Sequence, residues 1–498
     1  MIDINSIIKT LSSKDKYDFT VYLDRKNKRN DTKNIQLFKL LAEGETNSNI
    51  ICRKLYNSDN KNAYHGLRKR LFDSLIDFTA NKNLEDENSI DIQIIKYILA
   101  SRTFLLQKNF STAYKLLDKA EQLADEDSLF PILNEIYHTK IQYAPDYPKV
   151  DLEDLIRKQN ENRKKHHLED QLNTVYSKLK SVLHLISYER KIVDFETILE
   201  QTLKGSDIKL NESLSFKSLY QILAIANISA FITTRYFEIE DFVLKSYDIL
   251  KNKKETNKQL YYQIQIVYII ANTLFRNKKF EESLKYINEM EQLMLLKKSA
   301  HYKTFVLKRT LVKALNLNYS NSAKEAILIT KDSITKKHND IEALLDLHLS
   351  LLMFYFQQND LNNAKSIVSK FYHTDNWYIE KAGIDWVIKK NLAELLLYIE
   401  LSDEDLFYSR LKSFKRLYTK HLKNTNQTRI LTFLNFAEGY YKNSQIASTK
   451  NFKSKVEEGF KWTQTHEEDI FVISFYAWLK SKIEHKPLYE TTLELVKK

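Results

Sequence analysis

The sequence predicts an all-α protein, an α-α superhelix or solenoid of antiparallel helix hairpins that begins with a small helical module. Three observations predict this class. The chain has six glycines and four prolines in 498 residues, where average usage would give about sixty. Apolar residues recur at helical spacing along most of the chain, and short polar breaks separate the amphipathic segments. Because sheets need glycine, proline or Asn-Gly at their turns, sandwiches, barrels and open α/β sheets are excluded.

The N-terminal residues 1–85 are expected to form a basic helical module. Their apolar patterns predict helices over 4–12, 14–27, 32–43, 47–56 and 61–82. In the last of these, apolar residues step by three or four positions and form one stripe, made of Tyr64, Leu67, Leu71, Leu75 and Phe78. We expect this module to cap the end of the solenoid, which would otherwise expose an apolar face.

Beyond residue 85 the chain repeats one layout, in which two amphipathic segments flank a very short polar break. The clearest case has segments over 258–275 and 280–295, separated by four polar residues that begin with Arg276. The same layout surrounds the breaks that begin at Gln107 and Gln357. Helix pairs with short connections, repeated along a long chain, are typical of an α-solenoid.

The residues at these helix crossings resemble the tetratricopeptide repeat family. That family places small residues where the two helices of a hairpin cross and aromatic residues around the crossing. Three units match this spacing, with Ser101, Phe104, Phe110, Ala113 and Ala120 in the first, Ala271, Leu274, Phe280 and Ser283 in the second, and Leu352, Tyr355, Leu361 and Ala364 in the third. The resemblance implies a degenerate tetratricopeptide-like array over residues 86–498.

One interruption of this array is expected near 143–150. Pro145 and Pro148 stand close together there, and proline interrupts an α-helix. Asp151 then supplies a helix N-cap, and an acidic first turn follows it. We expect the next helix to be long, from 151 towards 190.

The sequence contains no motif of catalysis or of cofactor binding. The six glycines are too widely spaced for a glycine-rich phosphate loop. The twelve histidines are dispersed without a His-Glu-x-x-His pattern, and no Gly-x-Ser-x-Gly nucleophile motif occurs. The single cysteine, Cys52, excludes a disulfide framework and is expected to be a half-buried structural thiol. We therefore expect a protein that is not an enzyme, with no catalytic residue, no metal and no cofactor.

We expect a cytoplasmic protein that does not enter a membrane. Residues 1–12 show no basic region followed by an apolar run, and no stretch approaches about eighteen uninterrupted apolar residues. A single cysteine fits a reducing compartment. The net charge of +12 has two interpretations, attraction to acidic partners such as nucleic acid or anionic lipid, or AT-rich coding that over-uses Lys, Asn and Ile. We favour the second.

The tetratricopeptide resemblance implies that peptides bind on a concave surface formed by the first helix of each hairpin. In the central unit, the family's groove positions fall on Gln265, Tyr268, Asn272 and Arg276. Asn272 and Arg276 are residue types that can hold a peptide backbone and a carboxylate. In the other two units, which are mostly apolar, the positions are Ile95, Ile98, Arg102 and Leu106, and Asp346, Leu349, Met353 and Gln357.

The N-terminal module has a second interpretation as a DNA-binding element. Residues 1–82 hold sixteen Lys and Arg against ten Asp and Glu, and so carry +6 of the net +12. Segments 49–56 and 62–71 resemble the helix, turn and basic second helix of winged-helix regulators. That resemblance implies contacts to phosphates or base edges from His65, Arg68, Lys69 and Arg70. Basic residues on a helix face can also be simply solvated, in which case the module only caps the solenoid.

The function that the sequence favours is non-catalytic. We expect a scaffold or adaptor that binds a protein or peptide in the concave groove. The alternative is a transcriptional regulator, in which residues 1–85 bind DNA and the solenoid senses a partner. Salt-dependent binding of duplex DNA separates the two hypotheses.

Overall fold

The protein is helical in every part that the structure describes. The computed structural model describes residues 4–26, 33–85, 90–189, 191, 193, 197–199, 201, 214–233, 235–251, 259–336, 338–425, 427–460 and 470–497. Within these ranges no strand occurs, which confirms the predicted all-α class. The chain divides into two compact units, Met1–Asn162 (unit 1) and Arg163–Lys498 (unit 2), and each is described by itself.

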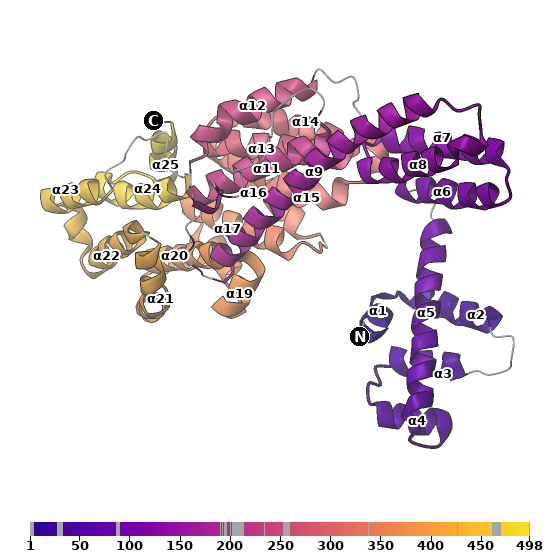
Figure 1. Cartoon of the computed structure of the whole chain (residues 1–498). Coiled ribbons are helices and arrows are strands. Elements are labelled where there is room, and N and C mark those ends of the chain that lie inside the picture. The colour runs from indigo at the N-terminus through magenta and orange to yellow at the C-terminus, as the bar shows by residue number, and fades with distance from the viewer. Residues whose placement is uncertain are drawn as a thin grey trace. The chain divides into compact units, whose positions relative to one another are not determined.

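Unit 1 begins with five helices around one core. They are α1 (Ile4–Thr10), α2 (Ser13–Lys26), α3 (Lys33–Ala42), α4 (Ser48–Tyr56) and α5 (Lys61–Glu85). Helix α5 runs through the middle of the group, and α2, α3 and α4 pack against it (Figure 1). Its predicted apolar stripe lies in the core, where Leu71 and Leu75 are fully buried together with Phe19. All five helices were predicted from the apolar pattern, with ends that differ by a few residues.

Local capping explains why α4 and α5 are separate helices. The Asn47 side chain accepts a hydrogen bond from the Asn49 N–H and caps the start of α4. Asn57, with φ of 51°, ends α4 in the left-handed conformation that asparagine tolerates. Cys52 on α4 is fully buried, so the expectation of a half-buried thiol was wrong in degree. Its neighbours in the five-helix core are apolar, which accounts for the burial.

The second part of unit 1 has a core of its own. It contains α6 (Ile90–Leu106), α7 (Phe110–Glu126), α8 (Phe130–Tyr143) and the first turns of α9 (Leu152–Ser187). Ser101, Ala113 and Ala120 have no exposed surface, so small residues do occupy the crossing of α6 and α7. The predicted module boundary at 85 falls between the two cores of unit 1 and stays a prediction.

The predicted interruption of the array is present. A 3₁₀ turn, η1 (Ala144–Asp146), follows α8. Asp151 then caps α9, because its Oδ1 accepts a hydrogen bond from the Asp154 N–H at 3.0 Å. Helix α9 has 36 residues, which confirms the long helix predicted from 151 towards 190. Its N-terminal end packs in unit 1 and its C-terminal half packs on α11 in unit 2.

Unit 2 contains the remaining helices. Its first half contains α11 (Phe216–Thr233), α12 (Phe237–Lys251), α13 (Leu260–Arg276), α14 (Phe280–Ser299), α15 (Tyr302–Tyr319), α16 (Ala323–Ile334), α17 (Ile341–Gln357) and α18 (Leu361–Val368). Its second half contains α19 (Asp375–Ala382), α20 (Ile384–Glu400), α21 (Glu404–Asn424), α22 (Thr428–Lys442), η2 (Ser444–Ser448), α23 (Lys450–Gly459), α24 (Ile470–Glu484) and α25 (Leu488–Val496).

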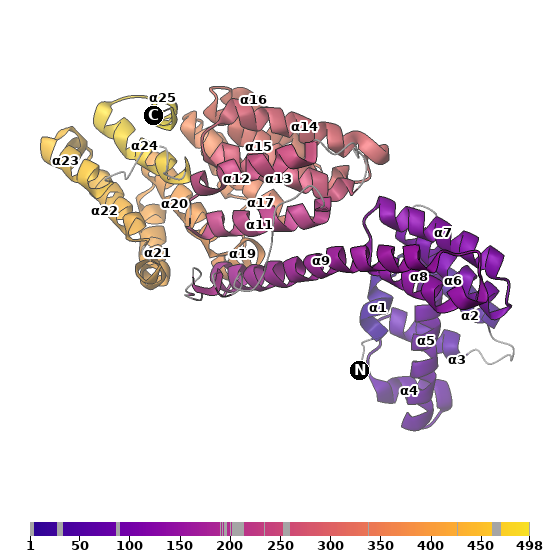
Figure 2. The same ribbon diagram turned by 45° about the horizontal axis from the view of Figure 1, so that its top comes forward.

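The first half of unit 2 is a row of helix hairpins. Helices α13, α15 and α17 each pack against the helix that follows and against one another in order (Figure 2). At the crossing of α13 and α14, the Ser283 hydroxyl donates a hydrogen bond to the Ala271 carbonyl at 2.7 Å. Neither residue has exposed surface. Small residues therefore bring these two helices close together, as the sequence predicted.

The C-terminal helices return to the middle of unit 2. Helix α25 packs against α15, and the Tyr489 hydroxyl donates a hydrogen bond to the Asn318 carbonyl at 2.6 Å. The hydroxyls of Tyr319 and Ser474 lie 2.8 Å apart, which ties α15 to α24. Unit 2 thus closes back on itself, an arrangement that hydrophobic periodicity alone does not predict.

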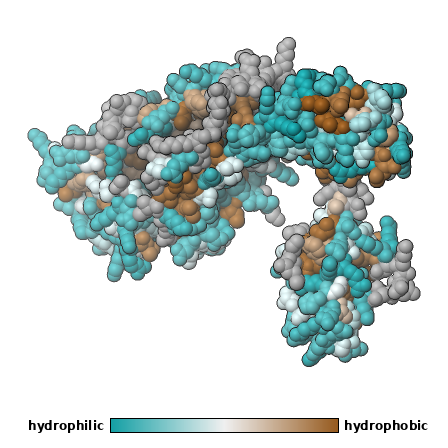
Figure 3. Space-filling model, in the orientation of Figure 1, coloured by the Kyte–Doolittle hydropathy of each residue, from teal (hydrophilic) through white to brown (hydrophobic). Residues whose placement is uncertain are grey.

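The surface of the chain is mixed. The face drawn in Figure 3 is mainly hydrophilic, with apolar residues in small groups. One helix among the described residues, Phe216–Thr233, is long and apolar enough to span a membrane, and half of it is buried inside the protein. Its buried side chains include Leu219 and Leu223, which belong to a core shared with other helices of unit 2.

Candidate functional site

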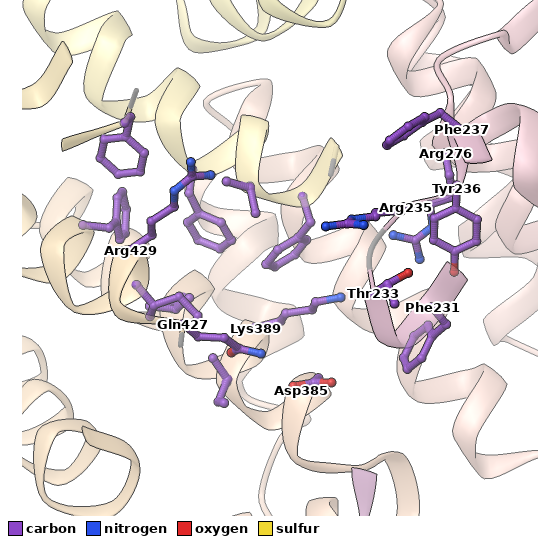
Figure 4. Close-up of a pocket in the computed structure, with 18 of the residues that line it drawn as sticks. Phe231, Thr233, Arg235, Tyr236, Phe237, Arg276, Asp385, Lys389, Gln427 and Arg429 are labelled. Atoms are coloured by element: carbon purple, nitrogen blue, oxygen red, sulfur yellow. The ribbon is translucent and has the colours of Figure 1, made fainter. Parts of the chain in front are cut away.

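Unit 2 contains a cavity of about 650 Å³, called the pocket below. One wall comes from the end of α11, the start of α12 and the last residue of α13, and the other comes from α20, α22 and α24 (Figure 4). Seven aromatic residues line it, Phe231, Tyr236, Phe237, Phe433, Phe460, Phe471 and Phe475. The pocket therefore lies where the return of the C-terminal helices brings distant parts of unit 2 together.

Short contacts at helix ends fix the first wall. The Asn277 side-chain amide donates a hydrogen bond to the Tyr236 carbonyl at 3.3 Å and another to the Glu240 carboxylate at 2.7 Å. These bonds join the start of α12 to the end of α13. The guanidinium of Arg276 then lies 5.5 Å from the centre of the Tyr236 ring, within the range of a cation–π interaction.

Helical spacing builds the second wall. Asp385, Ile388, Lys389 and Leu392 recur at intervals of three and four along α20, so they share one face. Gly383 permits the sharp entry into α20. Its φ is +84°, and a Cβ placed there would lie 3.2 Å from the Ser187 carbonyl oxygen.

The pocket carries an excess of positive charge. Four cationic side chains line it, Arg235, Arg276, Lys389 and Arg429, against the two carboxylates of Glu238 and Asp385. Arg235 pairs with Glu238 at 3.4 Å, and both side chains are exposed. Lys389 and Arg235 extend into the space from opposite walls (Figure 4). The remaining three cations thus face a single carboxylate in the lining.

Lys389 has an unusual environment for a lysine. Its ammonium lies 4.8 Å from the centre of the Phe471 ring, and it forms no ion pair with any residue that the structure describes. The Asp385 side chain likewise forms no hydrogen bond or ion pair within those residues. A half-buried cation and a nearby carboxylate are therefore both available to a ligand.

Two acidic residues, Glu342 and Asp346, lie on α17, and Asp346 is within electrostatic range of Lys389 and Arg276. Burial, together with the nearby carboxylate of Glu342, raises the pKa of Asp346 to about 7, although Lys389 and Arg276 oppose the shift. Burial also raises the pKa of Glu342. Near neutral pH, Asp346 therefore changes charge close to two of the pocket's cations.

The predicted groove residues of α13 do not all reach the pocket. Arg276 lines it. Tyr268 and Asn272 are half-buried on the same helix, and Lys308 lies 5.8 Å from the centre of the Tyr268 ring. Gln265 is buried, and its side-chain amide donates a hydrogen bond to the Tyr261 hydroxyl at 3.1 Å. The structure thus joins Arg276, rather than the whole predicted set, to the cavity.

Arg102 belongs to unit 1, whereas the groove candidates on α13 belong to unit 2. Its guanidinium forms an ion pair with Glu135 on α8. A tetratricopeptide-like groove that includes Arg102 stays a prediction.

The predicted nucleic-acid candidates lie on the first half of α5. His65, Lys69 and Arg70 are exposed, whereas Arg68 is half-buried and donates a hydrogen bond to the Tyr64 hydroxyl at 3.0 Å. The buried stripe of Tyr64 and Leu67 passes along the same helix turns. Three of the four side chains are therefore accessible.

Most of the residues that line the pocket were not predicted from the sequence as site residues. Lys389 and Asp385 belong to a visible helical pattern, but no pattern showed that α20 faces the ends of α11 and α13. Arg235 and Arg429 stand beside helix starts, where basic residues carry no special signal. The pairing of segments far apart in sequence was the missing information.

Comparison with protein-family models and with curated proteins gave no match for this chain. The fold and the pocket therefore define the class of protein, which in its described residues is all-helical, with packed hairpins and a cationic, aromatic cavity in unit 2. In the ranges that the structure describes, no group of three or more His, Cys, Asp or Glu residues is placed to hold a metal ion.

Proposed function

We propose that the protein is a non-catalytic scaffold or adaptor that binds a protein or peptide segment in the pocket of unit 2. The observation that carries this proposal is the pocket itself, which combines a volume of about 650 Å³ with seven aromatic residues and four cations. Cavities of this size, mostly apolar with a few polar groups, are the usual places where proteins bind ligands. Aromatic and arginine side chains also dominate the energetics of protein recognition.

A tetratricopeptide-like superhelix is part of the same proposal. Three observations support it: the row of hairpins from α13 to α18, the buried small residues at their crossings, and the position of Arg276 at the end of a first helix. In such an array the first helices of the hairpins share one surface. Arg276 on α13 and Asp346 on α17 influence each other electrostatically, which is consistent with that arrangement.

Site-specific photo-crosslinking in the native cell tests the proposal. Phe237 lines the pocket and is 37% exposed, so the photoreactive analogue p-benzoylphenylalanine can replace it without entering the core. We expect illumination to attach one defined partner at this position, and mass spectrometry of the conjugate to identify a short segment of that partner.

The matched control carries the same analogue at Tyr372. This residue is also in unit 2, is 79% exposed and does not line the pocket. We expect no specific conjugate there. Equal conjugates at both positions, or none at Phe237, would contradict binding in the pocket.

A second candidate function is DNA binding by the N-terminal helices. The observation that favours it is the pair α4 and α5, which pack together and present His65, Lys69 and Arg70 to solvent. A phosphate-contacting surface makes affinity fall steeply with salt. The test is binding of the full chain to duplex DNA, compared with a variant in which these three residues are alanine. Absence of binding at low salt, or an unchanged salt dependence in the variant, excludes this candidate.

A further inference from the structure

The pocket's chemistry narrows the class of ligand. We propose that the pocket takes a peptide segment that brings a carboxylate next to an aromatic or aliphatic side chain, an inference that rests on the binding function proposed above. The cations that would bind this ligand are Arg276 at the end of α13, Arg429 near the start of α22 and Lys389 on α20.

Charge favours an anion. Arg276, Lys389 and Arg429 line one cavity with Asp385 as the only lining carboxylate outside the Arg235–Glu238 pair. Like charges gathered in a half-enclosed site repel one another, because the surroundings screen them less than bulk water does. A ligand carboxylate relieves this repulsion. It can also accept paired hydrogen bonds from a guanidinium, which is the strongest geometry for such a group.

The lining favours an apolar side chain beside that carboxylate. Among the lining residues, Phe433 and Phe475 are buried, whereas Phe231 and Phe237 are 40% and 37% exposed. Exposed phenyl rings at the rim of a cavity lose contact with water when a ligand side chain covers them. An aromatic side chain of the ligand would gain further from ring–ring contacts with these phenylalanines.

Hydrogen bonding favours a peptide carboxylate over a phosphate. Asp385 has no partner in the described ranges, and a carboxylate can only accept hydrogen bonds at neutral pH. A peptide supplies backbone N–H donors to Asp385 together with a carboxylate to the cations. A phosphate group has no N–H donor and offers an O–H only when it is protonated, and its second negative charge is repelled by Asp385.

Three pools of random hexapeptides distinguish the sources of the carboxylate. The first pool ends in a free carboxylate and lacks Asp and Glu, the second is amidated and contains Asp and Glu, and the third is amidated and lacks them. Each pool is passed over immobilised full-length protein, and the retained peptides are quantified by mass spectrometry. We expect the first or the second pool to be retained about tenfold better than the third, since one charged hydrogen-bonding group is worth about that factor.

Variants then locate the binding. Lys389→Gln and Arg429→Gln each remove one charge from the pocket, and we expect each to lower retention about tenfold. The control Lys365→Gln changes an exposed lysine on α18 that does not line the pocket, and retention should be unchanged. Because Arg429 is exposed, its substitution keeps the test decisive if the Lys389 variant fails to fold.

The outcomes separate this inference from the proposed function. Equal retention of all three pools, with loss in both variants, keeps a peptide-binding pocket and overturns the carboxylate preference. Retention of no pool overturns both proposals. Displacement of retained peptides by ATP or inorganic phosphate at lower concentrations than by free peptide assigns the pocket to phosphate ligands and also overturns the inference.

Discussion

The ammonium of Lys389 lies 4.8 Å from the centre of the Phe471 ring, and this contact joins α20 to α24 across the wall of the pocket. The next residue, Lys390, points into the protein. Its side chain is 2% exposed, and its ammonium lies 3.0 Å from Asp375 and 3.4 Å from Glu394. Two consecutive lysines on one helix therefore have different environments, since Lys389 lines the pocket and Lys390 forms buried ion pairs.

These neighbouring lysines give a matched pair of stability predictions. Lys389→Met keeps the apolar stem against Phe471 and should change the free energy of unfolding by less than about 1 kcal/mol, the value of a cation–π contact. Lys390→Met removes the cation that pairs with half-buried Asp375 and leaves buried Glu394 with Arg410 alone, and should destabilise unit 2 by about 3–5 kcal/mol. Denaturant unfolding measures both. Equal changes in the free energy of unfolding would contradict the conclusion that Lys390, and not Lys389, stabilises the fold.

A second prediction concerns the pH dependence of stability. The pKa of Asp346 is raised from 3.8 to about 7 in the folded protein, so the folded state binds this proton more tightly than the unfolded state does. Stability contributed by Asp346 is therefore greatest at acid pH, falls between about pH 4 and 7, and is constant above that range. Glu342 has a raised pKa and acts in the same direction.

The variant Asp346→Asn isolates this effect. It should exceed the wild type in unfolding free energy by up to about 4 kcal/mol at pH 8, with a difference close to zero at pH 4. Comparing variant with wild type at each pH cancels the contribution of Glu342 as far as the two groups are independent. A difference that does not change with pH would show that Asp346 titrates normally.

A third prediction links the same residue to binding. Ionised Asp346 attracts Lys389 and Arg276, and it therefore competes with an anionic ligand for them. We expect the affinity for a retained carboxylate peptide to fall as pH rises through about 7. In Asp346→Asn, affinity should be independent of pH between 6 and 8. The same decline in both proteins would assign the pH dependence to another group.

A fourth prediction concerns the hairpin crossing. Ser283 donates to the Ala271 carbonyl at 2.7 Å and accepts from the Asn316 amide at 2.9 Å, inside a fully buried site. Ser283→Ala should lower the free energy of unfolding by about 1–3 kcal/mol, because buried polar groups lose a partner. The control Ser366→Ala removes an exposed hydroxyl on α18 and should change it by less than about 0.5 kcal/mol. Similar values for both would contradict a structural role of this crossing.

A fifth prediction compares the effects of replacing two glycines on stability. Gly383→Ala places a Cβ at a φ of +84° and 3.2 Å from the Ser187 carbonyl oxygen, and should destabilise unit 2 by about 1–3 kcal/mol. Gly66 lies inside α5 with nothing within 4 Å of an added Cβ. Gly66→Ala should therefore stabilise the protein by about 0.5–1 kcal/mol. Thermal unfolding of both variants reports the signs, and equal signs would contradict the backbone argument.

The helices could be predicted from the sequence because the residues that indicate them are neighbours in the chain. The apolar stripe of α5, the cap at Asp151 and the small residues at Ala271 and Ser283 are all features of neighbouring positions. The helix predicted over 47–56 ends where Asn57 follows, a residue type that tolerates left-handed backbone.

The pocket could not be predicted from the sequence, because its residues come together only in the folded chain. Arg276 was named as a groove residue, but its partners in the cavity, Lys389 and Arg429, come from helices that return late in the chain. Nothing in a periodic pattern states which helix faces which. The bonds that close unit 2, such as Tyr489 to the Asn318 carbonyl, join single polar atoms far apart in the sequence and leave no local signal.

The central claim is that Lys389 recognises a carboxylate in the pocket. Isothermal titration of a retained peptide into wild-type protein, Lys389→Gln and Lys365→Gln tests it most directly. We expect a dissociation constant about tenfold higher for Lys389→Gln and an unchanged constant for Lys365→Gln. The same dissociation constant in all three proteins would contradict it.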